Sequence, residues 1–247
     1  MALAWSVDDP PSREELREIA GRGQPVVRSN AQLLPVLPAL SGLLPEGGLR
    51  RGSVVSVAGS TSLALALIAG PSAAGSWCAA VGLSSLGLVA AAELGVALDR
   101  FPLVAAPAGG GVGWPVAVAA VLDAMDVVLA WPPPNVRAAD AGRIAARGRE
   151  RGAILVLGLG GGARAGPGQA RWPEGVDVRL AVSRARWEGL GQGHGRLAGR
   201  RVDVVVSGRR SAARERTVSL WLPATGGGIA LVDDAADPAA GTTVGLG

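Results

Sequence analysis

The stretch VVSVAGSTSLALALIAG, from Val54 to Gly70, decides the fold of this chain. Its short β-branched run predicts a buried strand, Gly59 and Ser60 predict a tight turn, and the apolar run that follows predicts a helix. Thr61 and Ser62 add two more hydroxyls at the start of that helix. A strand, a glycine turn and a helix in this order are the outline of a phosphate-binding loop.

Outward from this unit, strands and helices continue to alternate. Apolar runs predict strands at residues 53–59, 76–83, 101–107, 126–131 and 153–159, with helices between them. Such nearly continuous apolar strands are typical of a parallel sheet that helices cover on both faces. After Gly160 the helical pattern stops, and three strand-like segments predict antiparallel strands added at the C-terminal edge. The predicted class is α/β, a mostly parallel sheet with this antiparallel extension.

The domain organisation follows from composition along the chain. Residues 1–45 are expected to form an N-terminal arm with a short helix, because Ser12 and Glu15 have the spacing of a capping box. Residues 46–223 are expected to form the main domain. Residues 224–247 are small, acidic and rich in glycine, which is typical of a mobile tail.

Composition limits the chemistry that is available. The chain has 247 residues, about half of them apolar, and a formal net charge of +4. All of its basic residues are arginines apart from the single His194, so no lysine can neutralise a phosphate or form a Schiff base. The N-terminus lacks a basic segment before an apolar run, which predicts a cytoplasmic protein. The single Cys78 lies in an apolar strand-like run and is expected to be a buried structural thiol.

The candidate nucleotide site departs from a working phosphate loop, G-x-x-x-x-G-K-[ST], at two independent points. With Gly59 as the second glycine, Val54 takes the place of the first glycine and Ser60 that of the lysine. The acid that should follow a later strand and hold Mg²⁺ is also missing, because Trp131 stands there. The sequence therefore predicts no ATPase activity, no cofactor and no metal site. The alternative role for Ser60 is simply to cap an apolar helix.

A second candidate surface lies in the C-terminal strands, where arginines and a tryptophan cluster. On antiparallel strands these residues would form a basic face for DNA or an acidic partner. The alternative is a solvated sheet edge that charge protects from aggregation. The candidate contact residues are Arg184, Arg186, Trp187, Arg200, Arg201, Arg209, Arg210, Arg214 and Arg216.

The ordered set of these segments resembles the core of RecA-type proteins. The segment LLPEGGLRRGSVVSVAGSTSLALAL resembles the entry to that core, and DVVLAWPPP and RIAARGRERGAILVLGL resemble its continuation. The segments LAVSRARWEGLGQGHGRLAGRRVDVVVSGRR and VSLWLP resemble its closing strands. Within the RecA-like proteins the chain is most similar to the ImuA group, in its actinobacterial ImuA-prime branch.

This resemblance implies an accessory protein of the mutasome, the DNA-damage-induced system for translesion synthesis and SOS mutagenesis. The implied partner is a catalytically inactive homologue of Y-family polymerases, of the ImuB type. An error-prone replicative-type polymerase and RecA are further candidates, as is direct contact with DNA. The alternatives are a divergent RecA-like ATPase, a RecA modulator that binds single-stranded DNA, and a cell-division inhibitor of the SulA type.

Overall fold

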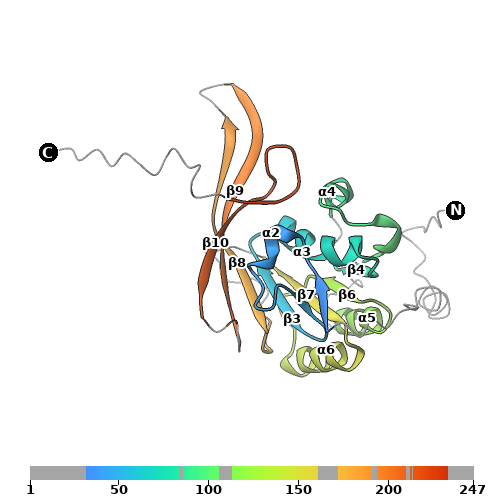
Figure 1. Ribbon diagram of the computed structural model, residues 1–247. Coiled ribbons are helices and arrows are strands. Elements are labelled where there is room, and N and C mark those ends of the chain that lie inside the picture. Colours follow the sequence, from blue (N-terminus) through green and yellow to red (C-terminus); the bar gives the residue numbers. More distant parts are fainter. Residues whose placement is uncertain are drawn as a thin grey trace.

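The computed structural model shows a single large sheet with helices on both of its faces (Figure 1). It describes residues 32–83, 86–105, 113–160, 172–190, 194–209, 212 and 214–232. The predicted helix near Ser12 therefore lies outside the described residues, as does most of the predicted tail. All structural statements below refer to the described ranges.

Nine strands of the described residues form the large sheet, and its two halves differ in direction. The parallel half contains, in spatial order, β5 (Leu103–Val104), β4 (Cys78–Val81), β6 (Val127–Ala130), β7 (Ile154–Leu159) and β3 (Val54–Ala58). Next to β3 lies β8 (Val178–Leu190), which is parallel to it and begins the other half. Antiparallel pairing then adds β9 (Gly195–Gly208), β10 (Arg216–Trp221) and β11 (Ala230–Leu231). The fold class predicted from the sequence is thus confirmed.

The helices divide the core into two layers, one on each face of the sheet. The central helix α3 (Thr61–Ala73) packs on one face, together with α2 (Pro38–Ser41) and α4 (Leu88–Glu93). On the other face lie α5 (Gly113–Leu122) and α6 (Ala138–Arg151). Because α3 is covered by protein on most of its circumference, its sequence is apolar all round rather than amphipathic. None of the described helices is long and apolar enough to cross a membrane.

The described part of the predicted N-terminal arm belongs to the domain. Strand β1 (Leu33–Pro35) pairs with β2 (Gly48–Arg50) in a separate two-stranded sheet. Leu34 and Leu40 are buried in the same core layer as α3. At the other end of the chain, β11 lies within the predicted tail and pairs with β10. Both the β1 segment and β11 are thus in contact with the rest of the described structure.

Cys78 lies at the start of β4 and is completely buried. Burial, with a smaller contribution from the charge of Asp126, raises the pKa of its thiol to about 12. This agrees with the predicted structural role of the cysteine.

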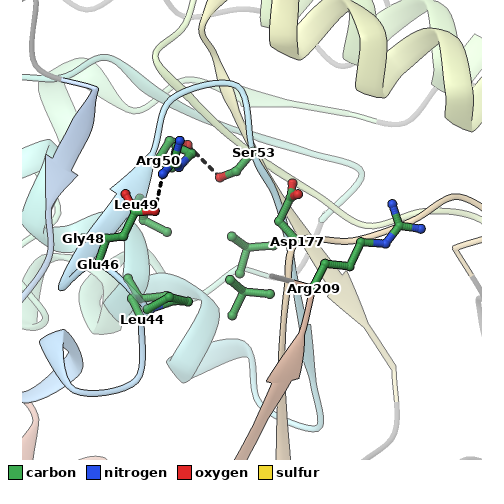
Figure 2. A pocket seen from close by; sticks show the side chains of 11 residues that line it. Leu44, Glu46, Gly48, Leu49, Arg50, Ser53, Asp177 and Arg209 are labelled. Carbon is green, nitrogen blue, oxygen red and sulfur yellow. Dashed lines mark hydrogen bonds and ion pairs between the residues drawn. The ribbon is translucent and has the colours of Figure 1, made fainter. Parts of the chain in front are cut away.

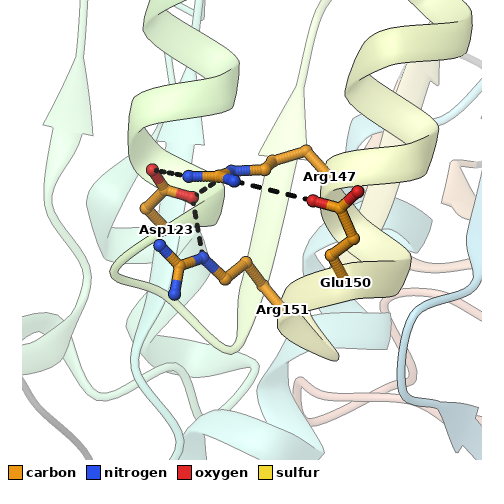
Figure 3. A network of polar contacts seen from close by, with 4 residues as sticks. All are labelled: Asp123, Arg147, Glu150 and Arg151. Carbon is orange, nitrogen blue, oxygen red and sulfur yellow. Dashed lines mark hydrogen bonds and ion pairs between the residues drawn. The ribbon is translucent and has the colours of Figure 1, made fainter.

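An ion-pair network joins the end of α5 to α6 (Figure 3). Arg147 donates two hydrogen bonds to Asp123, and Arg151 donates a third. Burial alone would raise the pKa of Asp123, but these hydrogen bonds outweigh it and hold the pKa below its usual value. Asp123 therefore stabilises the contact between two helices and does not face the candidate nucleotide site.

Candidate functional site

The predicted strand, turn and helix of the phosphate loop are present at the carboxyl end of β3. Gly59 has a φ of 82°, in the left-handed region that favours glycine. Ser60 is the N-cap of α3, because its Oγ accepts a hydrogen bond of 3.2 Å from the amide of Leu63. The serine at the lysine position thus closes the first turn of the helix.

An arginine from a distant strand occupies the space in front of this helix. Arg200 of β9 donates a hydrogen bond of 3.1 Å from Nη2 to Ser60 Oγ, and one of 2.9 Å from Nε to the carbonyl of Leu222. Partial burial lowers the pKa of Arg200 from its ordinary value. A cation at a helix N-terminus is electrostatically unfavourable, so local contacts must hold it there. The sequence marks Arg200 only as a DNA or partner contact, and the structure places it beside Ser60 at the start of α3.

Trp187 provides one of those contacts. It lies directly opposite Arg200 in the β8–β9 pair, and the guanidinium carbon is 5.6 Å from the centre of its ring. This is the geometry of a cation–π interaction. Trp187, Arg200 and Ser60 therefore form a chain of contacts that ties the C-terminal hairpin to the start of α3.

The position of the missing acid is filled by an aromatic ring. Trp131 follows β6, and its indole packs over Gly158 of the neighbouring strand β7. A Cβ atom on Gly158 would lie only 2.2 Å from two carbons of the ring, so only glycine fits there. The indole thus takes the place, at the carboxyl edge of the sheet, where a magnesium-binding carboxylate is expected.

Asp126 lies at the opposite edge of the sheet. It precedes β6 and accepts hydrogen bonds from Arg51 Nη1 at 2.9 Å and from the amide of Trp77 at 3.0 Å. Its role is to join three segments at the amino ends of the strands. The described residues also contain no group of three or more metal-ligating side chains.

The arginines of the C-terminal strands do not share one face. Arg216 donates to the carbonyls of Gly42 and Leu43, at 3.1 and 3.0 Å, and so holds β10 against the N-terminal segment. Arg209 lies beside Gly175 at the far end of β9, and Arg214 is exposed before β10. Arg210 lies outside the described residues. The remaining three are Arg184 and Arg186 of β8 and Arg201 of β9. Arg186 lies opposite Arg201, and Arg184 lies opposite Asp203.

A small cavity lies at the amino end of β3, away from the start of α3 (Figure 2). Its volume is about 60 Å³, enough for a few water molecules and too small for a nucleotide. Glu46 and Arg50 form an ion pair at its rim. This cavity therefore does not replace the candidate nucleotide site.

Comparison with known proteins gives two matches. Residues 42–161 match the family model of the MT3502 N-terminal domain. The chain is 36% identical over 184 residues to the uncharacterized protein Rv3395c of Mycobacterium tuberculosis (strain ATCC 25618 / H37Rv). That alignment covers 70% of this chain and 83% of the mycobacterial protein. Because so much of both proteins is aligned, this chain belongs to the same family as Rv3395c.

Proposed function

We propose that this protein is a non-catalytic, RecA-like accessory protein of the DNA-damage-induced mutasome. In this role it acts in the cytoplasm and supports translesion synthesis through contact with an inactive polymerase homologue of the ImuB type. The observation that carries the proposal is an α/β fold whose nucleotide-site positions hold other groups. Ser60 caps α3 and accepts a hydrogen bond from Arg200. The Trp131 ring packs over Gly158, at the position where a magnesium-binding acid is expected.

The groups that remain at the candidate nucleotide site contribute too little free energy to bind ATP tightly. A helix N-terminus contributes only about 0.3–2 kcal/mol to the binding of an anion. Because each tenfold in affinity needs about 1.4 kcal/mol, this contribution alone does not hold ATP at micromolar concentration. Arg200 brings one positive charge to the site, but its Nη2 and Nε already donate to protein oxygens.

The hairpin arm, defined as residues 187–190 and 195–198 of β8 and β9, supports a role in protein contact. β8 is parallel to β3 but continues past its carboxyl end, so the arm extends beyond the body of the sheet (Figure 1). It exposes Trp187, Leu190 and Leu197 by 46%, 63% and 50%. Exposed apolar side chains on a projecting element are typical of protein interaction sites.

The arm predicts the effect of substitutions on partner binding. The triple variant Trp187→Ser, Leu190→Ser and Leu197→Ser is expected to reduce co-purification with the ImuB-type partner at least tenfold, because it removes apolar area from the contact. The measurement is a pull-down of both full-length proteins, with the bound fraction quantified. The matched control is Val89→Ser with Val116→Ser, which removes exposed apolar side chains from α4 and α5.

Equal binding by the triple variant and wild type would show that the arm is not the contact. No retention of the wild type by the partner would contradict the proposed function itself.

The altered nucleotide site predicts that the protein does not bind ATP with micromolar affinity. Equilibrium dialysis against radiolabelled ATP and Mg²⁺ is expected to show no saturable binding up to about 100 μM ATP. The reason is that the side chains at the site do not contribute the free energy that such an affinity requires. Ser60→Asp is the control variant, since aspartate caps a helix as well as serine but repels phosphate. Saturable binding that disappears in this variant would favour the ATPase alternative.

A further inference from the structure

One face of the C-terminal strands carries several arginines and a tryptophan in register. In the β8–β9–β10 pairing, Arg186 lies opposite Arg201, which lies opposite Trp221. The next row contains Arg184, Asp203 and Ser219. Because paired residues of neighbouring strands point to the same side of a sheet, these rows share one face. Arg179 lies on the same face farther along β8, opposite Ser207.

None of the described helices covers this face. The opposite face of these strands supplies buried residues such as Val182, Val202 and Val204 to the core layer of α3. The core layer of α5 and α6, in contrast, includes no residue of β8, β9 or β10 among those described. Arg179, Arg184 and Arg186 are exposed, and Trp221 is half-buried. We call Arg179, Arg184, Arg186, Arg201 and Trp221 the basic sheet face.

The acidic residues on this face do not cancel its charge. Among the residues whose pairing in β8, β9 and β10 is described, they are Asp203 and Glu188, against four arginines, of which Arg179, Arg184 and Arg186 are exposed. Asp203 accepts a hydrogen bond of 2.7 Å from Ser219 Oγ, so part of its hydrogen-bonding capacity is used within the sheet. Alternate residues of a strand are about 6.6 Å apart, so Arg184 and Arg186 present regularly spaced cations along β8. Regularly spaced guanidinium groups complement a chain of phosphates.

The shape of the face favours a single strand over a duplex. The backbones of three neighbouring strands span about 10 Å before side chains are added, whereas a major groove about 12 Å wide admits a two-stranded ribbon. The indole of Trp221 lies beside Gly199, which leaves room for the ring above the sheet. An aromatic ring next to arginines on an open sheet is an arrangement that stacks unpaired bases and holds their phosphates.

The geometry points to the basic sheet face as a binding site for single-stranded nucleic acid, with arginines on the phosphates and Trp221 against a base. This inference does not depend on the proposed mutasome role, because it concerns the isolated chain. It also separates these residues from Trp187 and Arg200, which lie on the opposite face of the same strands.

Fluorescence anisotropy of a labelled dT20 oligonucleotide with the full-length protein tests the site. The variant Arg184→Ala with Arg186→Ala is expected to raise the Kd at least tenfold and to reduce the slope of log K against log salt by about 1.4, since each phosphate contact to a single strand contributes about 0.7. Trp221→Leu is expected to raise the Kd about fivefold or more without changing the salt slope, because stacking is not ionic. A reduced salt slope in the arginine variant would identify contacts to phosphates, and an unchanged salt slope in the Trp221 variant would identify stacking on a base.

Matched controls make the result specific. Arg143→Ala with Arg149→Ala removes two exposed charges from α6 and is expected to leave the affinity within twofold of wild type. Equal loss in this control would mean that overall charge, rather than the face, binds the oligonucleotide, and would overturn the site. No binding of dT20 by the wild type, or tighter binding of a 20-base-pair duplex, would also overturn it. Arg179 lies at the other end of the face and provides an independent test. Arg179→Ala is expected to reduce the slope of log K against log salt by about 0.7.

Discussion

Replacement of Gly158 by alanine is expected to lower the free energy of unfolding by about 2–3 kcal/mol. The added Cβ would lie 2.2 Å from two carbons of the Trp131 indole, well inside van der Waals contact. The ring can move only by disturbing its own packing, because Trp131 is partly buried against the core layer of α3. Urea denaturation followed by circular dichroism measures the change.

Two further variants separate this clash from a general effect of alanine. Gly160→Ala places a Cβ in open space near the end of the same strand and is expected to change stability by less than about 0.5 kcal/mol. Trp131→Ala removes the ring, so Gly158→Ala should cost much less in that background. If Gly158→Ala were as stable as the wild type, the Trp131 indole would not be packed against Gly158.

Replacement of Gly70 by alanine is expected to destabilise the protein by about 2 kcal/mol, although alanine is the better helix former. Gly70 lies in α3, and a Cβ there would lie 2.6–2.8 Å from backbone atoms of Val36 and Pro35. A backbone cannot move aside as a flexible side chain does. The segment after β1 would therefore have to move away from the central helix, which the midpoint of urea denaturation reports.

Gly142 offers a matched comparison, since it also lies inside a helix. A Cβ at this position of α6 would meet only Glu174 Oε2, at 3.4 Å. Gly142→Ala is therefore expected to leave stability unchanged or to raise it by up to about 1 kcal/mol. If Gly70→Ala lowers the free energy of unfolding and Gly142→Ala raises it, the effect of close packing is separated from that of helix propensity. The same sign for both would contradict the tight contact between α3 and the β1 segment.

Much of the parallel half of the fold is predictable from the sequence, because its strands are short apolar runs and its helices fall between them. The segments β3, β4, β6 and β7 lie within the predicted ranges. The small β1–β2 pair is harder to predict, since each strand has three residues and contains either proline or glycine. Its stability comes from the burial of Leu34 and Leu49 in the tertiary structure, which local pattern does not reveal.

The candidate site is predictable where it depends on neighbouring residues and not where it depends on strand register. Ser60 follows the first predicted strand directly, so its role as a helix cap can be read locally. Arg200 is 140 positions away, and only the pairing of β8 with both β3 and β9 brings it to Ser60. Gly158 gives a usable signal, because a glycine inside an apolar strand often marks a close approach. The sequence alone does not identify the ring that approaches it.

The face of the sheet on which each arginine lies also depends on strand register. Sequence places them in one basic segment, whereas alternation along β8 and β9 sends Trp187 and Arg200 to one side and Arg184, Arg186 and Arg201 to the other. A register shift between Val182 and Arg184 sets this division, and such irregularities in a ladder are not visible in composition.

The burial of Cys78 has a practical consequence for observing this protein in action. A thiol inside β4 with a pKa of about 12 is almost entirely protonated at neutral pH and inaccessible to maleimides. A cysteine introduced at Leu190 or Leu197 would then be the reactive thiol of an otherwise unaltered chain. A fluorophore or spin label attached there would report directly on what the hairpin arm meets, and the native cysteine would need no replacement.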